Sequence, residues 1–158
     1  MTKTQIAILL LLVPPLAGCV TEQAPPPRIE KDRVFEAPFD KAWSATVAVF
    51  AEHNYPIKAI EKDSGLISSE PLRLPRPGTG AFRQWAVLPS VAFGVWQAAN
   101  CTVTVFVVSQ DSEHTKVQVN SAINAFESNV SGQWHQGYST GTIECKILDS
   151  VQHKLDQG

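Results

Sequence analysis

The chain has 158 residues, of which 44% are hydrophobic and 18% are charged. This length favours a single domain, and the composition is typical of a globular protein rather than a disordered one. The formal net charge of −2 provides no basic surface of the kind that nucleic-acid binding usually requires, and no general attraction to anionic lipid head groups. We therefore predict no nucleic-acid partner, and any link to a membrane must come from a specific segment.

Residues 1–18 are predicted to be a lipoprotein signal peptide. Lys3 gives a positive start, and the apolar run over residues 6–15 is too short to span a bilayer core of about 30 Å. The run ends in Leu16-Ala17-Gly18-Cys19, which resembles the bacterial lipobox. The resemblance implies cleavage before Cys19, diacylglycerol on its thiol and an acyl group such as palmitate on its amino group. The alternative is an ordinary secretory signal in which the cysteine is incidental.

Residues 19–32 are expected to be the lipid-bearing start and a tether. Pro25, Pro26 and Pro27 favour an extended stem that holds the domain away from the lipid surface. Val20 stands where the enteric sorting rule places an aspartate in lipoproteins kept in the inner membrane. In a host that follows this rule, we expect an outer-membrane anchor with the domain facing the periplasm; in another host, either membrane stays open.

The first elements of the folded domain, expected over residues 33–158, are a strand, a helix and a hairpin. A short strand is predicted at residues 33–36. Asp40 or a neighbour caps a helix that Asn54 and Pro56 end, with apolar residues recurring at helical spacing. Strands that begin at residue 57 and cover residues 66–69 form a hairpin around a turn rich in Asp, Ser and Gly.

The second half of the domain is predicted to be mostly antiparallel strands. A Pro/Gly-rich loop covers residues 71–80, and one or two strands follow before residue 97. Residues 101–109 alternate, with Val103, Val105 and Val107 on one face, and residues 116–124 form the antiparallel partner. A polar stretch then leads to a helix capped by Ser139 or Thr140. Its apolar stripe is Ile143, Ile147, Leu148, Val151 and Leu155.

This element order predicts an α+β fold. Two helices with single apolar stripes need a sheet to cover, so the expected architecture is a two-layer domain with an antiparallel β-sheet and both amphipathic helices on one face.

Three stretches of the chain resemble known lipoproteins. They are Val34-Phe35-Glu36-Ala37-Pro38-Phe39-Asp40-Lys41-Ala42-Trp43, Ile60-Glu61-Lys62-Asp63-Ser64-Gly65-Leu66-Ile67 and Thr140-Gly141-Thr142-Ile143-Glu144. Together they are similar to the helix-grip domains in the lipoprotein C subunit of the β-barrel assembly machinery. The resemblance covers about half of the mature chain, which has one domain where that subunit has two. It implies a helix-grip-like fold, an envelope location and an accessory or scaffold role, and it carries no catalytic residue.

Two cysteines remain after lipidation of Cys19. In an oxidising periplasm a pair usually forms a disulfide, so a Cys101–Cys145 bridge between the sheet and the last helix is expected. It would close a loop of about 44 residues and contribute roughly 4 kcal/mol in the chain-entropy model. The alternative is two buried free thiols. Neither a CxxC motif nor paired histidine spacing occurs, so no metal site is predicted.

Two aromatic stretches are candidate partner-binding sites, because both mix aromatic residues with flexible or polar neighbours. The candidate residues are Arg73, Arg76, Phe82, Arg83, Trp85 and Trp96 in and after the Pro/Gly-rich loop, and Trp134 and Tyr138 in the polar stretch. The alternative is that these tryptophans complete the core from loop positions.

No catalytic motif is present in the sequence. The first hypothesis is a non-enzymatic, membrane-anchored lipoprotein that acts as an accessory or scaffold subunit of a cell-envelope assembly, with an envelope protein as partner and no cofactor. The second is a lipoprotein that holds a small apolar or glycan ligand. A third is a hydrolase with dispersed residues that include His135.

Overall fold

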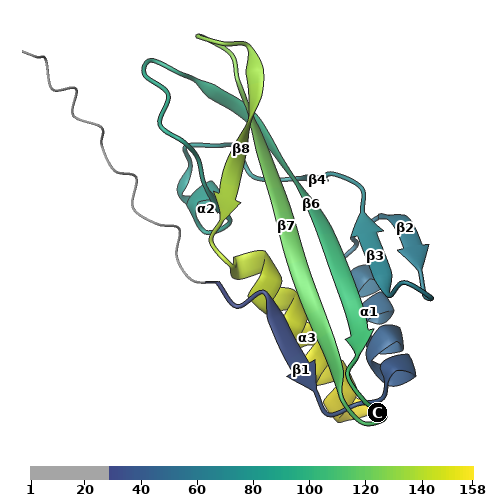
Figure 1. Cartoon of the computed structure of the whole chain (residues 1–158). Helices are drawn as coiled ribbons and strands as arrows, with labels where there is room; N and C mark the ends of the chain where they lie inside the picture. Colours follow the sequence, from purple (N-terminus) through teal and green to yellow (C-terminus); the bar gives the residue numbers. More distant parts are fainter. Residues whose placement is uncertain (1–28) are drawn as a thin grey trace, which may run out of the picture.

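The computed structural model describes residues 29–158, so the expected signal peptide and Cys19 lie outside the described residues. The described part is α+β, with an antiparallel sheet of eight strands and three helices (Figure 1), which confirms the predicted fold class. The strands are β1 (Asp32–Phe35), β2 (Ile57–Glu61), β3 (Leu66–Ser69), β4 (Leu72–Arg73), β5 (Ala86–Val87), β6 (Trp96–Ser109), β7 (Thr115–Glu127) and β8 (Gln133–Ser139). The helices are α1 (Phe39–Glu52), α2 (Gly80–Arg83) and α3 (Thr142–Gln157).

The long hairpin of β6 and β7 is the centre of the sheet. The two strands pair from Trp96 opposite Glu127 to Ser109 opposite Thr115. Near the β6–β7 turn, β3 pairs with β6, β1 pairs with β7, and β2 lies outside β3. Towards the other end, β4 pairs with β6, β8 pairs with β7, and β5 pairs with β8. The sheet therefore has two halves that share the same two strands.

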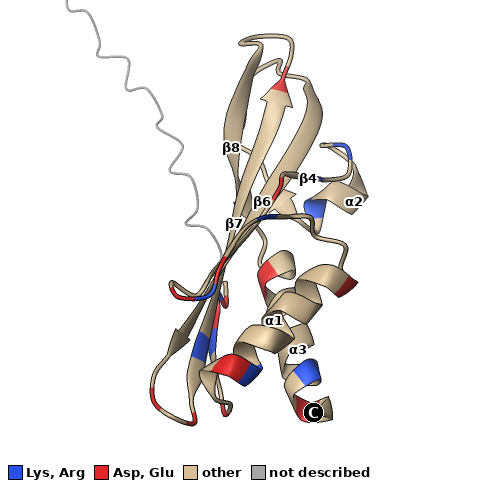
Figure 2. Ribbon diagram, turned by 90° about the vertical axis from the view of Figure 1, so that its right-hand side faces the viewer, with Lys and Arg blue, Asp and Glu red and all other residues tan. Residues whose placement is uncertain are grey.

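Helices α1 and α3 pack against each other on one face of the half that contains the β6–β7 turn, which we call the helix-backed half (Figure 2). Val103, Val105 and Val107 share one face of β6, as their alternation predicts, and they point into this layer and are buried. Opposite them, Phe50 of α1 and Ile147 of α3 are fully buried. Within residues 29–158 the opposite face of the sheet carries no helix, so the described fold has two layers.

Gly65 closes the β2–β3 hairpin where only glycine fits. Its φ is +67°, and a Cβ built on it would lie 2.0 Å from the carbonyl oxygen of Val107. The same backbone approach produces a hydrogen bond in which the Val107 N–H donates to the Gly65 carbonyl oxygen over 2.8 Å. The predicted turn therefore joins the hairpin to the central strand β6.

Helix α3 begins at a second glycine with positive φ. Gly141, with φ +93°, is the N-cap residue, and no side chain caps the helix in the way we predicted for Ser139 or Thr140. The Ser139 hydroxyl instead accepts from the Gly141 N–H and donates to the carboxylate of Glu144. A Cβ on Gly141 would lie 2.6 Å from Cγ2 of Ile29, so the first described residues pack tightly against the start of α3.

The other differences from the predicted elements lie in the less regular segments. The first helix begins at Phe39 with Pro38 as its N-cap residue, and Asp40 lies in the first helical turn. Residues 80–83 form the short helix α2, and the predicted polar stretch contains strand β8. No helix in residues 29–158 is both long and apolar enough to cross a membrane.

Candidate functional site: an uncharged arm and a cleft at its base

The half of the sheet without α1 and α3 extends beyond the helical layer as an arm (Figures 1 and 2). We define the arm as the ends of β6 and β7 remote from their turn, strand β8, and the loops 88–95 and 128–132. The sequence has no Asp, Glu, Lys or Arg over residues 84–110 or over residues 128–143. Glu127 is therefore the one such residue in the arm, and it is fully buried.

The Glu127 carboxylate holds the tip of the arm together. It accepts hydrogen bonds from the backbone N–H groups of Val95, Asn129, Val130 and Ser131, at 2.5–3.3 Å, and from the Ser131 hydroxyl at 2.9 Å. The bonds from the backbone N–H groups, that of Ser131 foremost, lower the pKa of Glu127 to about 2. One buried carboxylate thus fixes loop 128–132 and ties it to the end of loop 88–95.

His135 takes part in the same structure and not in a catalytic relay. Its Nε2 lies 2.9 Å from the Ser131 hydroxyl, and its ring packs edge-on against Trp96 with centroids 5.4 Å apart. In a nucleophile–base–acid triad the carboxylate orients the histidine. Here the Glu127 carboxylate bonds to the serine instead, so this geometry positions loops and supplies no argument for the hydrolase hypothesis.

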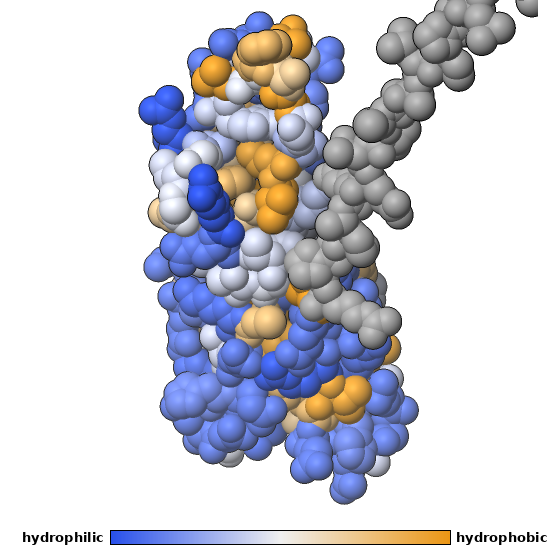
Figure 3. Space-filling model, turned by 90° about the vertical axis from the view of Figure 1, so that its left-hand side faces the viewer, coloured by the Kyte–Doolittle hydropathy of each residue, from blue (hydrophilic) through white to orange (hydrophobic). Residues whose placement is uncertain are grey.

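Apolar side chains are exposed at the tip of the arm (Figure 3, top). Phe93 is 94% exposed and has φ +59°, a backbone conformation that bulky residues rarely adopt. Val95 and Val130 are also exposed, on the two loops that Glu127 joins. A fixed, strained loop that presents a phenylalanine to water is typical of a functional surface.

The outer face of the arm, which looks away from the helical layer, combines aromatic and amide side chains. Trp134 is 53% exposed and Tyr138 is 46% exposed. The Trp134 ring packs against Phe126 of β7, with centroids 5.6 Å apart. Asn124 and Gln136 pair across the strands beside them. The face therefore carries large aromatic rings and hydrogen-bonding groups without any formal charge.

The other predicted partner-binding residues divide into buried and exposed groups. Phe82 is only 3% exposed and belongs to the core, so its predicted role in binding is wrong: α2 turns its side chain inward. Trp85 and Trp96 are partly buried and pack against the core, as the alternative for these residues expected. The three arginines, Arg73, Arg76 and Arg83, are exposed.

A cleft lies at the base of the arm, between the end of α1, strand β4, Trp85 and the first turns of α3; we call it the basal cleft. It has a volume of about 330 Å³. Tyr55, Arg73, Trp85 and Lys146 line it, and Cys101 is among the residues at its wall. Burial, with a further contribution from Cys101, raises the pKa of Tyr55, so its hydroxyl stays protonated at neutral pH.

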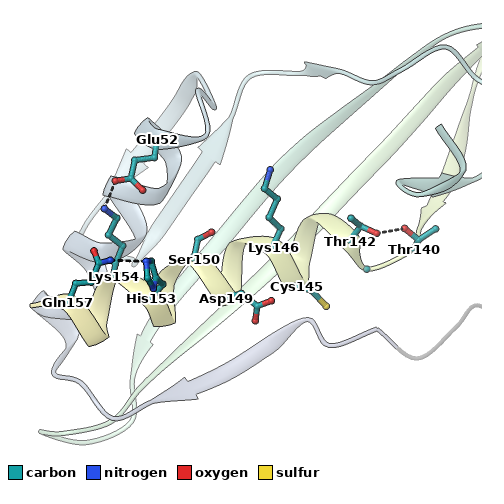
Figure 4. Close-up of a pocket in the computed structure, with 11 residues that line it drawn as sticks. Glu52, Thr140, Thr142, Cys145, Lys146, Asp149, Ser150, His153, Lys154 and Gln157 are labelled. Atoms are coloured by element: carbon teal, nitrogen blue, oxygen red, sulfur yellow. Dashed lines mark hydrogen bonds and ion pairs between the residues drawn. The ribbon is translucent and has the colours of Figure 1, made fainter. Parts of the chain in front are cut away.

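A second hollow runs along the exposed side of α3 (Figure 4). Its side chains are largely engaged with one another. Lys154 forms an ion pair with Glu52, and His153 bonds to Gln157 at 2.7 Å. Most of the charged groups in this hollow are already paired, and the unpaired Lys146 lines the basal cleft as well, so the hollow offers a ligand less than the basal cleft does.

The expected Cys101–Cys145 disulfide is not present in the structure, where both thiols are free. Cys101 faces the core, and burial raises the pKa of its thiol to about 12. Cys145 points to the side of α3 where Asp149 also lies, as Figure 4 shows. Burial, with a further contribution from the Glu30 carboxylate just before β1, raises the pKa of its thiol. The two thiols thus occupy different sides of the start of α3.

A buried polar group lies under the start of α3. Glu144 is fully buried; its Oε2 accepts from the Ser139 hydroxyl at 2.7 Å, and its Oε1 has no hydrogen-bond partner.

Among the described residues, no group of three or more His, Cys, Asp or Glu side chains is arranged to hold a metal ion.

The chain matches no family model, and no curated protein matches it. The site must therefore be read from its own residues. The sequence analysis named Trp134 and Tyr138, which the structure exposes, but it did not name Phe93 or Glu127. A signal for the arm was present, because a run of 27 residues without charge, from 84 to 110, is conspicuous in a chain with 28 charged residues among 158.

Proposed function

We propose that this protein is a lipid-anchored, non-enzymatic accessory subunit of a cell-envelope assembly, and that it binds a protein partner through the arm. The observation that carries the proposal is the uncharged arm itself, which exposes Phe93 at its tip and Trp134 and Tyr138 on its outer face. The lipobox that ends at Cys19 supports the anchor and the envelope location.

The composition of the arm fits a protein interface. The cores of such interfaces are depleted in charge and enriched in aromatic residues, and tryptophan and tyrosine supply most binding hot spots. The Glu127 hydrogen bonds hold the tip loops in one arrangement, which reduces the entropy lost on binding. Trp134 and Tyr138 also keep an indole N–H and a hydroxyl available for hydrogen bonds to the partner.

Site-specific crosslinking in the envelope tests the proposal. A photo-reactive phenylalanine analogue at Gln136, between the two exposed aromatic residues, should give one defined crosslinked partner. The analogue at Lys58, exposed on β2 of the helix-backed half, should not give that product. The substitution Trp134→Ala with Tyr138→Ala should reduce the product tenfold or more, because each residue is expected to be a hot spot.

A matched control removes apolar surface from the same face of the sheet at its other end. Val34→Ala with Val108→Ala alters residues that are 47% and 51% exposed in the helix-backed half, and the crosslink from Gln136 should persist. No product from Gln136, or a product that survives loss of both aromatic residues, would contradict the proposal.

The anchor is tested separately. Metabolic labelling with a palmitate analogue should mark the chain, and Cys19→Ser should abolish the label and release the protein from the membrane fraction. An unlabelled parent protein that fractionates like the Cys19→Ser variant would contradict the lipid anchor without bearing on the arm.

A further inference from the structure

We propose that the basal cleft binds a small organic acid, in which a carboxylate, sulfonate or phosphate group is attached to an apolar body. This inference does not depend on the proposed function, because the cleft lies at the base of the arm and uses none of its exposed aromatic residues. Its support comes from charge, wall chemistry and hydrogen-bonding capacity.

The charge of the basal cleft is opposite to that of the whole chain. Arg73 and Lys146 line it, and none of its lining residues is an Asp or a Glu, although the formal net charge of the chain is −2. Within the described part of the chain, neither cation forms an ion pair. Burial, together with the nearby Lys146 ammonium, lowers the pKa of His53, so this ring adds no charge at neutral pH.

Three separate elements place these groups around one space. Arg73 comes from β4, Lys146 from the second turn of α3, and Tyr55 from the segment after α1. Lys146 also lines the hollow along α3, together with Asp149 and Glu52 (Figure 4). Those two carboxylates are paired elsewhere, Asp149 with Arg33 and Glu52 with Lys154, so the Lys146 ammonium remains available to a ligand.

The walls of the cleft are apolar and aromatic. Leu72, Leu74 and Ile143 line it together with the rings of Tyr55 and Trp85. All five belong to the hydrophobic core or pack against it, so the walls are held in place by the fold. A volume of about 330 Å³ lies at the lower end of the range for small-molecule sites, which suits a compact ligand with one ring system or a short acyl chain.

The hydrogen-bonding groups distinguish an acid from a sugar. Arg73, Lys146, the Tyr55 hydroxyl and the Trp85 indole N–H are donors, and the indole, ammonium and guanidinium groups cannot accept. A glycan presents many hydroxyl donors that need acceptors, and the lining has no carboxylate to supply them, only the side chains of Asn54, the neutral His53 and Tyr55. An anionic group provides the acceptors that these donors need, and charge-assisted bonds are the stronger kind.

Binding of a defined probe tests the inference. The probe is 2-naphthoate, titrated by calorimetry into the purified full chain in a nonionic maltoside detergent, with protein-free detergent subtracted. We expect saturable binding of 2-naphthoate, and at least tenfold weaker binding of 2-naphthol and of 2-naphthylmethylammonium, which keep the ring but lose or reverse the charge.

Paired charge-reversal variants locate the site. Arg73→Glu with Lys146→Glu should weaken 2-naphthoate binding at least tenfold. The control, Lys58→Glu with Arg76→Glu, changes the net charge equally at exposed positions that do not line the cleft, and it should bind like the parent. No saturable binding to the parent, equal loss in both variants, or binding of the cation as tight as that of the acid would overturn the inference.

Displacement experiments identify the source of the acid. Displacement of 2-naphthoate by decanoate but not by phosphatidylglycerol in mixed micelles supports a free acid. Displacement by phosphatidylglycerol, added at the same concentration of anionic groups as decanoate, supports a lipid head group. Displacement by phosphatidylcholine to the same extent would overturn recognition of the anion.

Discussion

The helix-backed half and the arm are built on the same two strands, β6 and β7, but they use them differently. In the helix-backed half, α1 and α3 bury the inner side of the strands, and cross-element ion pairs such as Arg33–Asp149 and Lys116–Asp32 lie at its surface. In the arm, Leu88 of loop 88–95 packs against Gly137 of β8, charge is confined to one buried carboxylate, and aromatic rings face water.

This contrast separates stability from recognition. Burial of apolar area is the main favourable term in folding, and most of the fully buried large side chains lie between the helices and the sheet. Exposed ion pairs contribute little to stability, but they keep a surface soluble and discourage non-specific association. A surface that lacks them and exposes aromatic rings is suited to a specific partner.

Two phenylalanines provide the largest expected difference between the halves. Phe50→Ala, in the helix-backed half, should lower the free energy of unfolding by about 3–5 kcal/mol, because it leaves a cavity in the core. Phe93→Ala, at the tip of the arm, should change it by no more than about 0.5 kcal/mol. Urea unfolding of both variants measures this difference. A similar loss in the two variants would break the comparison.

Gly65 tests how tightly the β2–β3 hairpin is joined to the central strand. Gly65→Ala should destabilise the protein by about 2–3 kcal/mol, because the methyl group meets the Val107 carbonyl and the φ of +67° disfavours alanine. Gly78→Ala is the matched control, since Gly78 has φ +85° but no atom within 4 Å of a built Cβ. It should cost about 1 kcal/mol from backbone strain alone. Equal losses in urea unfolding would show that the close approach has no energetic effect.

Glu127 is expected to stabilise the arm locally, with the smallest effect on the whole fold. Its pKa of about 2 lies below the ordinary value of 4.5, so its contribution is present above pH 4.5 and is lost as the pH falls through about 2. The NMR signals of loop 128–132 should therefore change between these pH values before those of α1 and α3.

The substitution Glu127→Gln should produce this loosening at neutral pH. Hydrogen exchange of the amides of Asn129, Val130 and Ser131 should accelerate, while exchange in the helix-backed half stays the same. Glu113→Gln removes the same charge from the exposed β6–β7 turn and should leave the arm unchanged. Exchange in the arm that is insensitive to Glu127→Gln would show that the carboxylate does not hold the tip.

The sequence predicts the helix-backed half well because its patterns are regular. The alternation around Val103, Val105 and Val107 predicted a strand with these residues on one face, and the spacing from Ile143 to Val151 predicted the last helix. The hairpin around Gly65 follows from turn chemistry. These features depend on local periodicity and on burial, both of which a single sequence records.

The arm was harder to predict because tertiary contacts determine its structure. The β8 sequence Gln133-Trp134-His135-Gln136-Gly137-Tyr138-Ser139 has few β-branched residues and no apolar alternation, so its pairing with β7 has little local signal. The role of Glu127 depends on backbone N–H groups that converge only after folding. The inward orientation of Phe82 likewise follows from the position of α2, which sequence periodicity does not specify.

The contact between Ile29 and Gly141 determines how far the domain can travel from its anchor. Ile29, the first described residue, lies beside the start of α3 and close to where the two halves meet, so an anchor that connects to the domain there leaves both ends of the molecule accessible. Nine residues lie between Cys19 and Ile29, and the ten Cα–Cα steps that join them span at most about 35 Å in a fully extended chain. With Cys19 lipidated as proposed, Ile29 stays within that distance of the bilayer surface. A partner must therefore be within reach of a domain that is held close to the membrane.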